Sequence, residues 1–136
     1  MNRALTLGLV LLFVAGCTLP DERASLVPLP ENSGPVAYAE LLTRARRQAD
    51  AANEAFMVNK WSDLEEAAKT LEQTARFMSK ASDVPEKHKF TLAATSSTLA
   101  QDATKLLENA KAKDVKEANE TLRRVLLTVR ELRLDN

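Results

Sequence analysis

The chain has 136 residues and no net formal charge, because 19 lysines and arginines balance 19 aspartates and glutamates. Proteins that bind nucleic acids usually carry a basic excess on one face, so this balance argues against a nucleic-acid partner. The single cysteine excludes a disulfide within the chain, and the three glycines beside many Ala, Leu, Glu, Lys and Arg residues predict an all-helical protein.

The amino-terminal residues have the layout of a secretory signal. Arg3 supplies a positive charge, residues 5–14 form an apolar run, and small residues precede Cys17. The apolar run is too short to span a membrane, which takes about 20 residues. Residues 1–16 are therefore predicted to be a signal peptide. An ordinary cleaved signal that leaves Cys17 as a spare thiol stays open as the alternative.

The sequence Val14-Ala15-Gly16-Cys17 resembles the lipobox of bacterial lipoproteins. The resemblance implies that the Cys17 thiol receives a diacylglycerol, that the chain is cut before it, and that the new amino terminus is acylated. Two or three acyl chains hold a protein stably on a membrane, whereas one chain binds only marginally. Thr18 stands where an aspartate would favour the inner membrane, so the resemblance implies the outer membrane, facing the periplasm. In a host with one membrane, the same anchor implies the cell surface.

Residues 17–34 are predicted to be the lipidated cysteine followed by an extended tether. Pro20, Pro28 and Pro30 interrupt this stretch, which has no periodic apolar face. A polyproline-like chain advances about 3 Å per residue, so the tether could reach about 50 Å. We expect it to lift the following domain clear of the lipid headgroups rather than to form part of that domain.

Apolar residues recur at three- and four-residue spacing through the rest of the chain, which predicts four helices. The first is expected from Pro35, whose fixed φ suits the first helical position, to about Asn59. The second is expected to open at the capping box Ser62–Glu65 and to end near Ala81. Trp61 directly precedes this box, and we expect it to pack against the first turn.

The third helix is expected to begin around Pro85, and the fourth at the capping pattern Asp114–Glu117. The predicted core seams combine large and small residues: Leu42, Ala45, Ala49, Ala52 and Phe56; Leu64, Ala68, Leu71, Ala75 and Met78; Leu92, Ser96, Leu99, Ala103, Leu106 and Ala110; Val115, Ala118, Leu122, Val125, Val129 and Leu132. Helices of about 20 to 25 residues with short connections predict an antiparallel up-down-up-down four-helix bundle over residues 35–136.

Several features together resemble the small cytochrome c′-type four-helix bundles: Trp61 at the second helix, a proline-led third helix, the turn at residues 111–114 and the run at residues 119–125. In that family the last helix carries a Cys-x-x-Cys-His motif that holds haem. Here Val129, Leu132 and Arg133 stand at the three haem-attaching positions. The resemblance therefore implies a bundle of this type without its covalent haem.

A haem or metal ion bound without covalent attachment would need ligands among the histidine, methionine and acidic side chains. His88 lies between two lysines at the start of the third helix, so we expect it at the surface and not as a haem ligand. Met57 and Met78 are expected to fill gaps in the core. The bundle-type metal motif Glu-x-x-His is absent from the sequence, so no metal ligand is named. The carboxylates of the second helix are expected to form a solvated face; they are Asp63, Glu65, Glu66 and Glu72.

Two charged surfaces follow from the expected topology. One lies at the end of the bundle remote from the tether, and its candidate partner-binding residues are Trp61, Lys111, Lys113 and Lys116. The other is a strip of arginines on the first and fourth helices, which could bind phosphate or carboxylate groups but is expected to be balanced by acidic neighbours. Its members are Arg44, Arg47, Arg123, Arg124, Arg130 and Arg133.

These observations predict a non-enzymatic lipoprotein, held on a membrane by lipid on Cys17, that acts as an interaction or structural module in the cell envelope. No catalytic residue, metal ligand or cofactor other than the covalent lipid is named, and an envelope protein is the expected partner. The alternative is a carrier that binds haem, a metal ion or a small apolar molecule between its helices.

Overall fold

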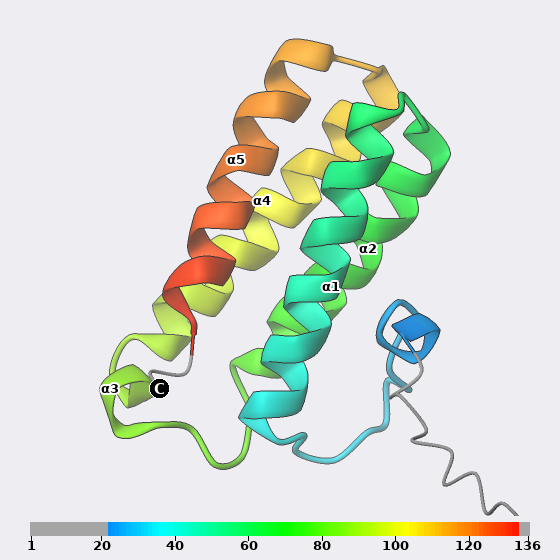
Figure 1. The fold of residues 1–136 in the computed structure, drawn as a ribbon. Coiled ribbons are helices and arrows are strands. Elements are labelled where there is room, and N and C mark those ends of the chain that lie inside the picture. The colour runs from blue at the N-terminus through cyan, green and yellow to red at the C-terminus, as the bar shows by residue number, and fades with distance from the viewer. Residues whose placement is uncertain (1–21, 134–136) are drawn as a thin grey trace, which may run out of the picture.

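The computed structural model of the chain describes residues 22–133, and this part is all-helical, with no strand (Figure 1). A short 3-10 helix, η1 (Glu22–Ser25), comes first. The α-helices are α1 (Tyr38–Met57), α2 (Trp61–Met78), α3 (Glu86–Lys89), α4 (Leu92–Ala112) and α5 (Val115–Glu131). The predicted signal peptide and Cys17 lie outside the described residues.

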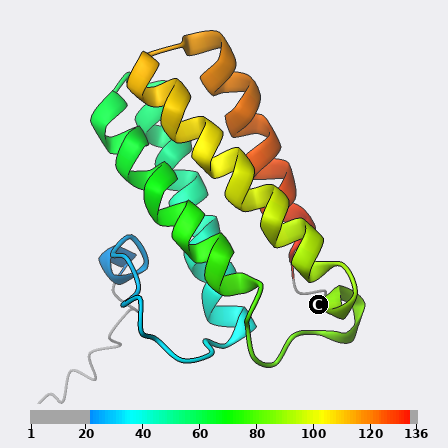
Figure 2. The same ribbon diagram turned by 180° about the vertical axis from the view of Figure 1, so that it is seen from behind.

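The four long helices share one apolar interior. Helix α1 packs against α2 and α5, and α4 packs against the same two helices. Figures 1 and 2 show the four lying side by side, with η1 on the side of α1 and α2 that is remote from α4 and α5. Each long helix therefore buries one apolar stripe against two neighbours, which is how amphipathic helices obtain most of their stability in a folded protein.

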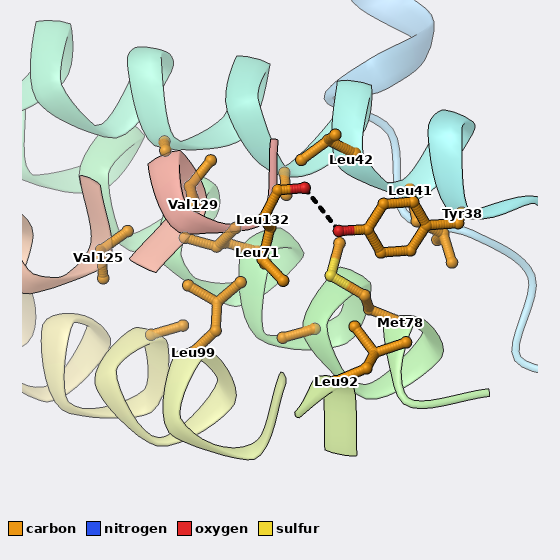
Figure 3. Close-up of a cluster of buried hydrophobic side chains, with 14 residues drawn as sticks. Tyr38, Leu41, Leu42, Leu71, Met78, Leu92, Leu99, Val125, Val129 and Leu132 are labelled. Carbon is orange, nitrogen blue, oxygen red and sulfur yellow. Dashed lines mark hydrogen bonds between the residues drawn. The ribbon is translucent and has the colours of Figure 1, made fainter. Parts of the chain in front are cut away.

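Large and small side chains alternate within this interior. Around Leu71 and Leu99 the core also contains Tyr38, Met78 and Val129, and Figure 3 shows these side chains converging from four helices. A second cluster, nearer the C-terminal ends of α1 and α4, combines leucines with alanines: Ala52, Ala55, Leu64, Ala67, Ala68, Leu106, Ala110, Ala118 and Leu122. The alanines allow the backbones to approach, while each buried leucine contributes about 1.5–3 kcal/mol.

Two of the expected helix starts are wrong. Helix α1 begins at Tyr38 and not at Pro35, because Ala37 before it is extended and forms a β-bridge with Ser82, in which the Ser82 N–H donates to the Val36 carbonyl and the Tyr38 N–H donates to the Ser82 carbonyl. Helix α2 begins at Trp61, and its N-cap is Lys60, which makes no side-chain capping bond. Ser62 therefore lies inside the first turn and does not cap the helix. The left-handed backbone of Asn59, with φ of 57°, reverses the chain before the predicted box is reached.

The third predicted helix is interrupted in the structure, whereas the fourth begins where the sequence predicted. The third is divided into the single turn α3 and the long helix α4, with Phe90 and Thr91 between them. The fourth begins as expected, because Asp114 is the N-cap of α5 and its Oδ1 accepts a 3.0 Å hydrogen bond from the Glu117 backbone N–H. Val115, which was predicted to lie in the core seam, is more than half exposed at the start of α5.

The segment of residues 24–31, called here the strap, is not the free spacer that the prolines suggested. Gln48 Nε2 donates to the Ser25 carbonyl at 2.9 Å, and Gln73 binds both the N–H and the carbonyl of Leu29 at 2.9 Å. Arg44 donates to two further strap carbonyls, those of Ala24 and Val27, at 3.1 Å. The strap is therefore part of the folded domain, fixed to the outer side of α1 and α2.

Candidate functional site

The predicted lipidation site cannot be located in the fold, because Cys17 lies before the first described residue, Glu22. What the structure adds is the chain that follows it. Side chains of α1 and α2 hold the strap within a few residues of Cys17, so the predicted anchor and the helical domain are separated by a short stretch of sequence.

The expectation that His88 lies at the surface is wrong. Its side chain is buried, and its ring stacks on that of Tyr38 with 5.6 Å between centroids. The Nε2 atom lies 3.1 Å from the Arg133 carbonyl oxygen, which only accepts hydrogen bonds, so this nitrogen carries a proton and donates. The neighbouring lysines are exposed, as expected, but the ring between them turns inward to the end of α5.

Most of the possible haem ligands and haem-attaching positions lie at one end of the core: Met78, Val129 and Leu132 share one buried cluster, and His88 stacks on Tyr38 of that cluster. Val129 and Leu132 are buried in the apolar core, whereas Arg133 is exposed. Met78 is buried next to Tyr38, but Met57 is largely exposed at the end of α1 and fills no gap in the core. Within residues 22–133, no group of three or more His, Cys, Asp or Glu side chains is arranged to hold a metal ion.

The candidate partner-binding residues gather around one end of the helical domain. Lys111 lies in the last turn of α4, Lys113 follows that helix in the left-handed conformation, and Lys116 lies in the first turn of α5; all three are exposed. Trp61 is half-buried and makes an edge-to-face contact with Phe56 at 6.1 Å, so it joins α2 to the last turn of α1. Trp61 also packs against the buried cluster that includes Leu64 of α2.

A groove of about 380 Å³ runs along the outer side of α1 and α2. Its lining combines apolar side chains with a charged rim: Leu26, Ala51, Ala55, Val58 and Ala67, then Glu54, Lys60, Asp63 and Glu66. Lys60 and Asp63 form a 3.9 Å ion pair on this rim. Leu26 belongs to the strap, so the strap covers one part of the α1–α2 face and forms a wall for the part left open.

The predicted arginine strip divides into groups with separate roles. Arg44 and Arg47 bind the strap, and Arg124 forms a 3.0 Å ion pair with Asp102 that joins α4 to α5. Arg130 and Arg133 line a hollow of about 170 Å³ between α1 and α5. Arg46 is the third arginine of this hollow.

Sequence reasoning missed the two glutamines that hold the strap. Gln48 is buried on the α1 stripe between Ala45 and Ala49, and Gln73 is buried on α2 beside Leu71. A long amide side chain next to apolar positions was the available signal, because a buried amide must find hydrogen-bond partners. The Oε1 atom of Gln48 is the exception among the described residues, since it is buried without a donor.

Comparison with family models, curated proteins and solved structures found no match. Within residues 22–133, no helix combines the length and the apolar character needed to cross a membrane.

Proposed function

We propose that this protein is a lipid-anchored module of the bacterial cell envelope that acts by binding other envelope components and not by catalysis. The observation that carries the proposal is the run Val14-Ala15-Gly16-Cys17 directly after an apolar segment with Arg3 before it. In this proposal Cys17 carries the lipid, residues 1–16 are removed, and the domain faces the periplasm from the outer membrane. No metal or cofactor is assigned beyond the covalent lipid.

The proposed architecture of the domain is an antiparallel up-down-up-down four-helix bundle of the haem-free cytochrome c′ type. The closed ring of packing, from α1 to α2 to α4 to α5 and back to α1, supports it, as do the short connections after α1 and α4. The burial of Val129 and Leu132 is consistent with helix-packing roles at positions that attach haem in that family.

The proposed partner surface is the turn between α4 and α5 with the adjoining end of α2. It presents Lys111, Lys113 and Lys116 around the exposed side chain of Val115. Three ammonium groups around an apolar side chain suit an acidic protein surface with an apolar centre. Trp61 is proposed to support this end through its contact with Phe56.

Palmitate labelling and cell fractionation test the anchor. The full-length protein should incorporate labelled palmitate and sediment with membranes, and Cys17→Ser should abolish both. Absence of label on the native chain would overturn the lipoprotein proposal.

In vivo photo-crosslinking from Val115 tests the partner surface, with exposed Thr98 as the control position. A variant with Lys111→Glu, Lys113→Glu and Lys116→Glu should lose the crosslinked products that are specific to Val115.

The α1–α2 groove supports a second candidate, binding of a small apolar molecule. Its volume of about 380 Å³ lies within the usual range of small-ligand sites, and its lining is largely apolar. The site is on the outer side of the helices rather than between all four. Titration with an apolar fluorescent dye tests it: Ala51→Phe should fill the groove and abolish the signal, whereas Ala93→Phe on the exposed side of α4 should not.

A further inference from the structure

We infer that the strap holds the helical domain close to the bilayer, with the outer face of α1 and α2 toward the lipid headgroups. This inference rests on the proposed lipidation of Cys17. It reverses the expectation from the proline-rich sequence, which was a long spacer that separates the domain from the membrane. The partner proposed for this face is the bilayer into which the anchor itself inserts.

The length of the chain between Cys17 and η1 limits how far the domain can lie from the membrane. Five peptide steps separate Cys17 from Glu22, the first residue of η1, and they span at most about 18 Å when fully extended. With Cys17 taken at the edge of the hydrocarbon core, where its acyl chains would begin, the headgroup layer takes up roughly 6 Å of that distance. The start of η1 can therefore lie no more than about 12 Å above the headgroups. A free tether from Cys17 to Pro35 could instead reach about 65 Å when fully extended, or about 50 Å in a polyproline-like form.

The strap is held firmly enough on the domain to keep the connection from Cys17 to the domain this short. Gln48 and Gln73 are buried, and each bonds the strap backbone at 2.9 Å. Arg44 and Arg47 bind the strap from the same helix as Gln48. These contacts lie at both ends of the strap, so the segment resists lifting from either end.

The face next to the anchor carries side chains that suit a headgroup layer. Leu26 is 40% exposed and Val27 is 59% exposed, and both follow η1 directly. The neighbouring groove presents carboxylates as well as Lys60. Because this face has no single sign of charge, we expect the orientation to depend on the covalent anchor and the apolar side chains, and to be the same on zwitterionic and anionic vesicles.

Tryptophan quenching measures the orientation. The native Trp61 is replaced by Phe, and one tryptophan is placed at Glu66 on the groove rim or at Thr98, one turn from Asp102 on the α4 side. Full-length lipidated protein is incorporated into phosphatidylcholine vesicles that contain a headgroup-attached quencher. Glu66→Trp should be quenched several-fold more strongly than Thr98→Trp. Equal quenching at the two positions would overturn the inference.

Release of the strap provides the second arm. Gln48→Ala with Gln73→Ala should lower quenching at position 66 to the level at position 98, while circular dichroism confirms that the helices remain. Gln101→Ala, on the exposed side of α4, is the matched control and should change nothing. Unchanged quenching after verified strap release would also overturn the inference.

Vesicle flotation separates this inference from the proposed function. If the native chain fails to float and carries no lipid, the lipoprotein proposal fails and the inference fails with it. If the protein floats through Cys17 but both reporter positions are quenched equally, the lipoprotein proposal stands and only the orientation fails. Asymmetric quenching that is restricted to vesicles with anionic lipid would contradict the claim that the anchor and apolar side chains set the orientation.

Discussion

The phenol of Tyr38 donates a 2.5 Å hydrogen bond to the carbonyl oxygen of Leu132, which lies 94 positions later in the chain (Figure 3). Tyr38 is the first residue of α1, and Leu132 is the C-cap of α5. The last carbonyls of a helix have no partner within the helix, so this bond satisfies one of them inside the core. It joins the start of the first long helix to the end of the last.

Removing this hydroxyl should weaken the fold measurably. Tyr38→Phe keeps the ring packing but leaves the Leu132 carbonyl buried without its donor. We expect the free energy of unfolding to fall by about 1–3 kcal/mol, measured by urea denaturation at neutral pH. Phe77→Leu, at a half-buried α2 position without a hydrogen bond, serves as a packing control. Equal stability of Tyr38→Phe and the native chain would show that this bond contributes nothing net.

The same tyrosine predicts a loss of stability at alkaline pH. Burial raises the pKa of Tyr38 from 10.0 to about 12, because the phenolate would lose its hydration in the core. The folded state therefore keeps the proton that the unfolded chain releases above pH 10. This contribution is fully present below pH 10 and is lost as the pH rises toward 12, by an amount on the order of 2 kcal/mol.

Comparison with Tyr38→Phe isolates that effect from lysine titration, which both proteins share. The stability difference between the native chain and the variant should be constant below about pH 9 and should shrink between pH 10 and 12. Urea denaturation at a series of pH values gives the difference directly. A difference that stays constant to pH 12 would mean that Tyr38 ionises as readily folded as unfolded.

Helical periodicity predicted the core because it is a local signal. Leu71, Leu99 and Leu122 are buried as the three- and four-residue spacing indicated. The cap at Asp114 was equally local, since its bond reaches only to Glu117. The cap predicted at Ser62 failed because the left-handed turn at Asn59 starts α2 two residues earlier, with Lys60 as the N-cap.

The buried polar contacts could not be predicted in the same way. The partner of Gln48 lies 23 positions away, that of Gln73 lies 44 away, and that of His88 lies 45 away. Sequence spacing along one helix does not show which distant backbone group meets a side chain. Each of these residues was therefore assigned to solvent or left unassigned, although its burial depends on a bond across the fold.

A core leucine and a surface leucine should respond differently to truncation. Leu99→Ala removes a fully buried side chain from the centre of the core and should lower the free energy of unfolding by about 2–5 kcal/mol. Leu127 is 58% exposed on α5, so Leu127→Ala should change it by about 0.5 kcal/mol or less. Thermal and urea denaturation measure both. Similar losses at the two positions would contradict the packing described for α4 and α5.

Loss of one glutamine should loosen the strap without unfolding the helices. Gln73→Ala removes three hydrogen bonds to the strap, two to Leu29 and one to the Glu31 carboxylate. Amide exchange within residues 24–31 should accelerate about tenfold or more, while exchange in the α2 core changes little. Gln101→Ala is the control, because its amide contacts only Ser97 on an exposed surface. Uniform acceleration across the domain would instead indicate that the strap is needed for global folding.

Glycine substitutions at two nearby lysines should have opposite effects. Lys113 has a left-handed backbone with φ of 53°, which glycine adopts without strain, so Lys113→Gly should raise the free energy of unfolding by up to about 1 kcal/mol. Lys111 lies in the last turn of α4, where glycine is a poor helix former, so Lys111→Gly should lower it by about 0.5–1 kcal/mol. Both variants lose one exposed positive charge, so electrostatic effects are matched, and urea denaturation compares them. Both lysines belong to the proposed partner surface, so Lys113→Gly also separates binding from stability. If the domain becomes more stable yet loses its crosslinked partner, the ammonium group of Lys113 takes part in recognition. A fall in stability at both positions would contradict the helix end placed at residue 113.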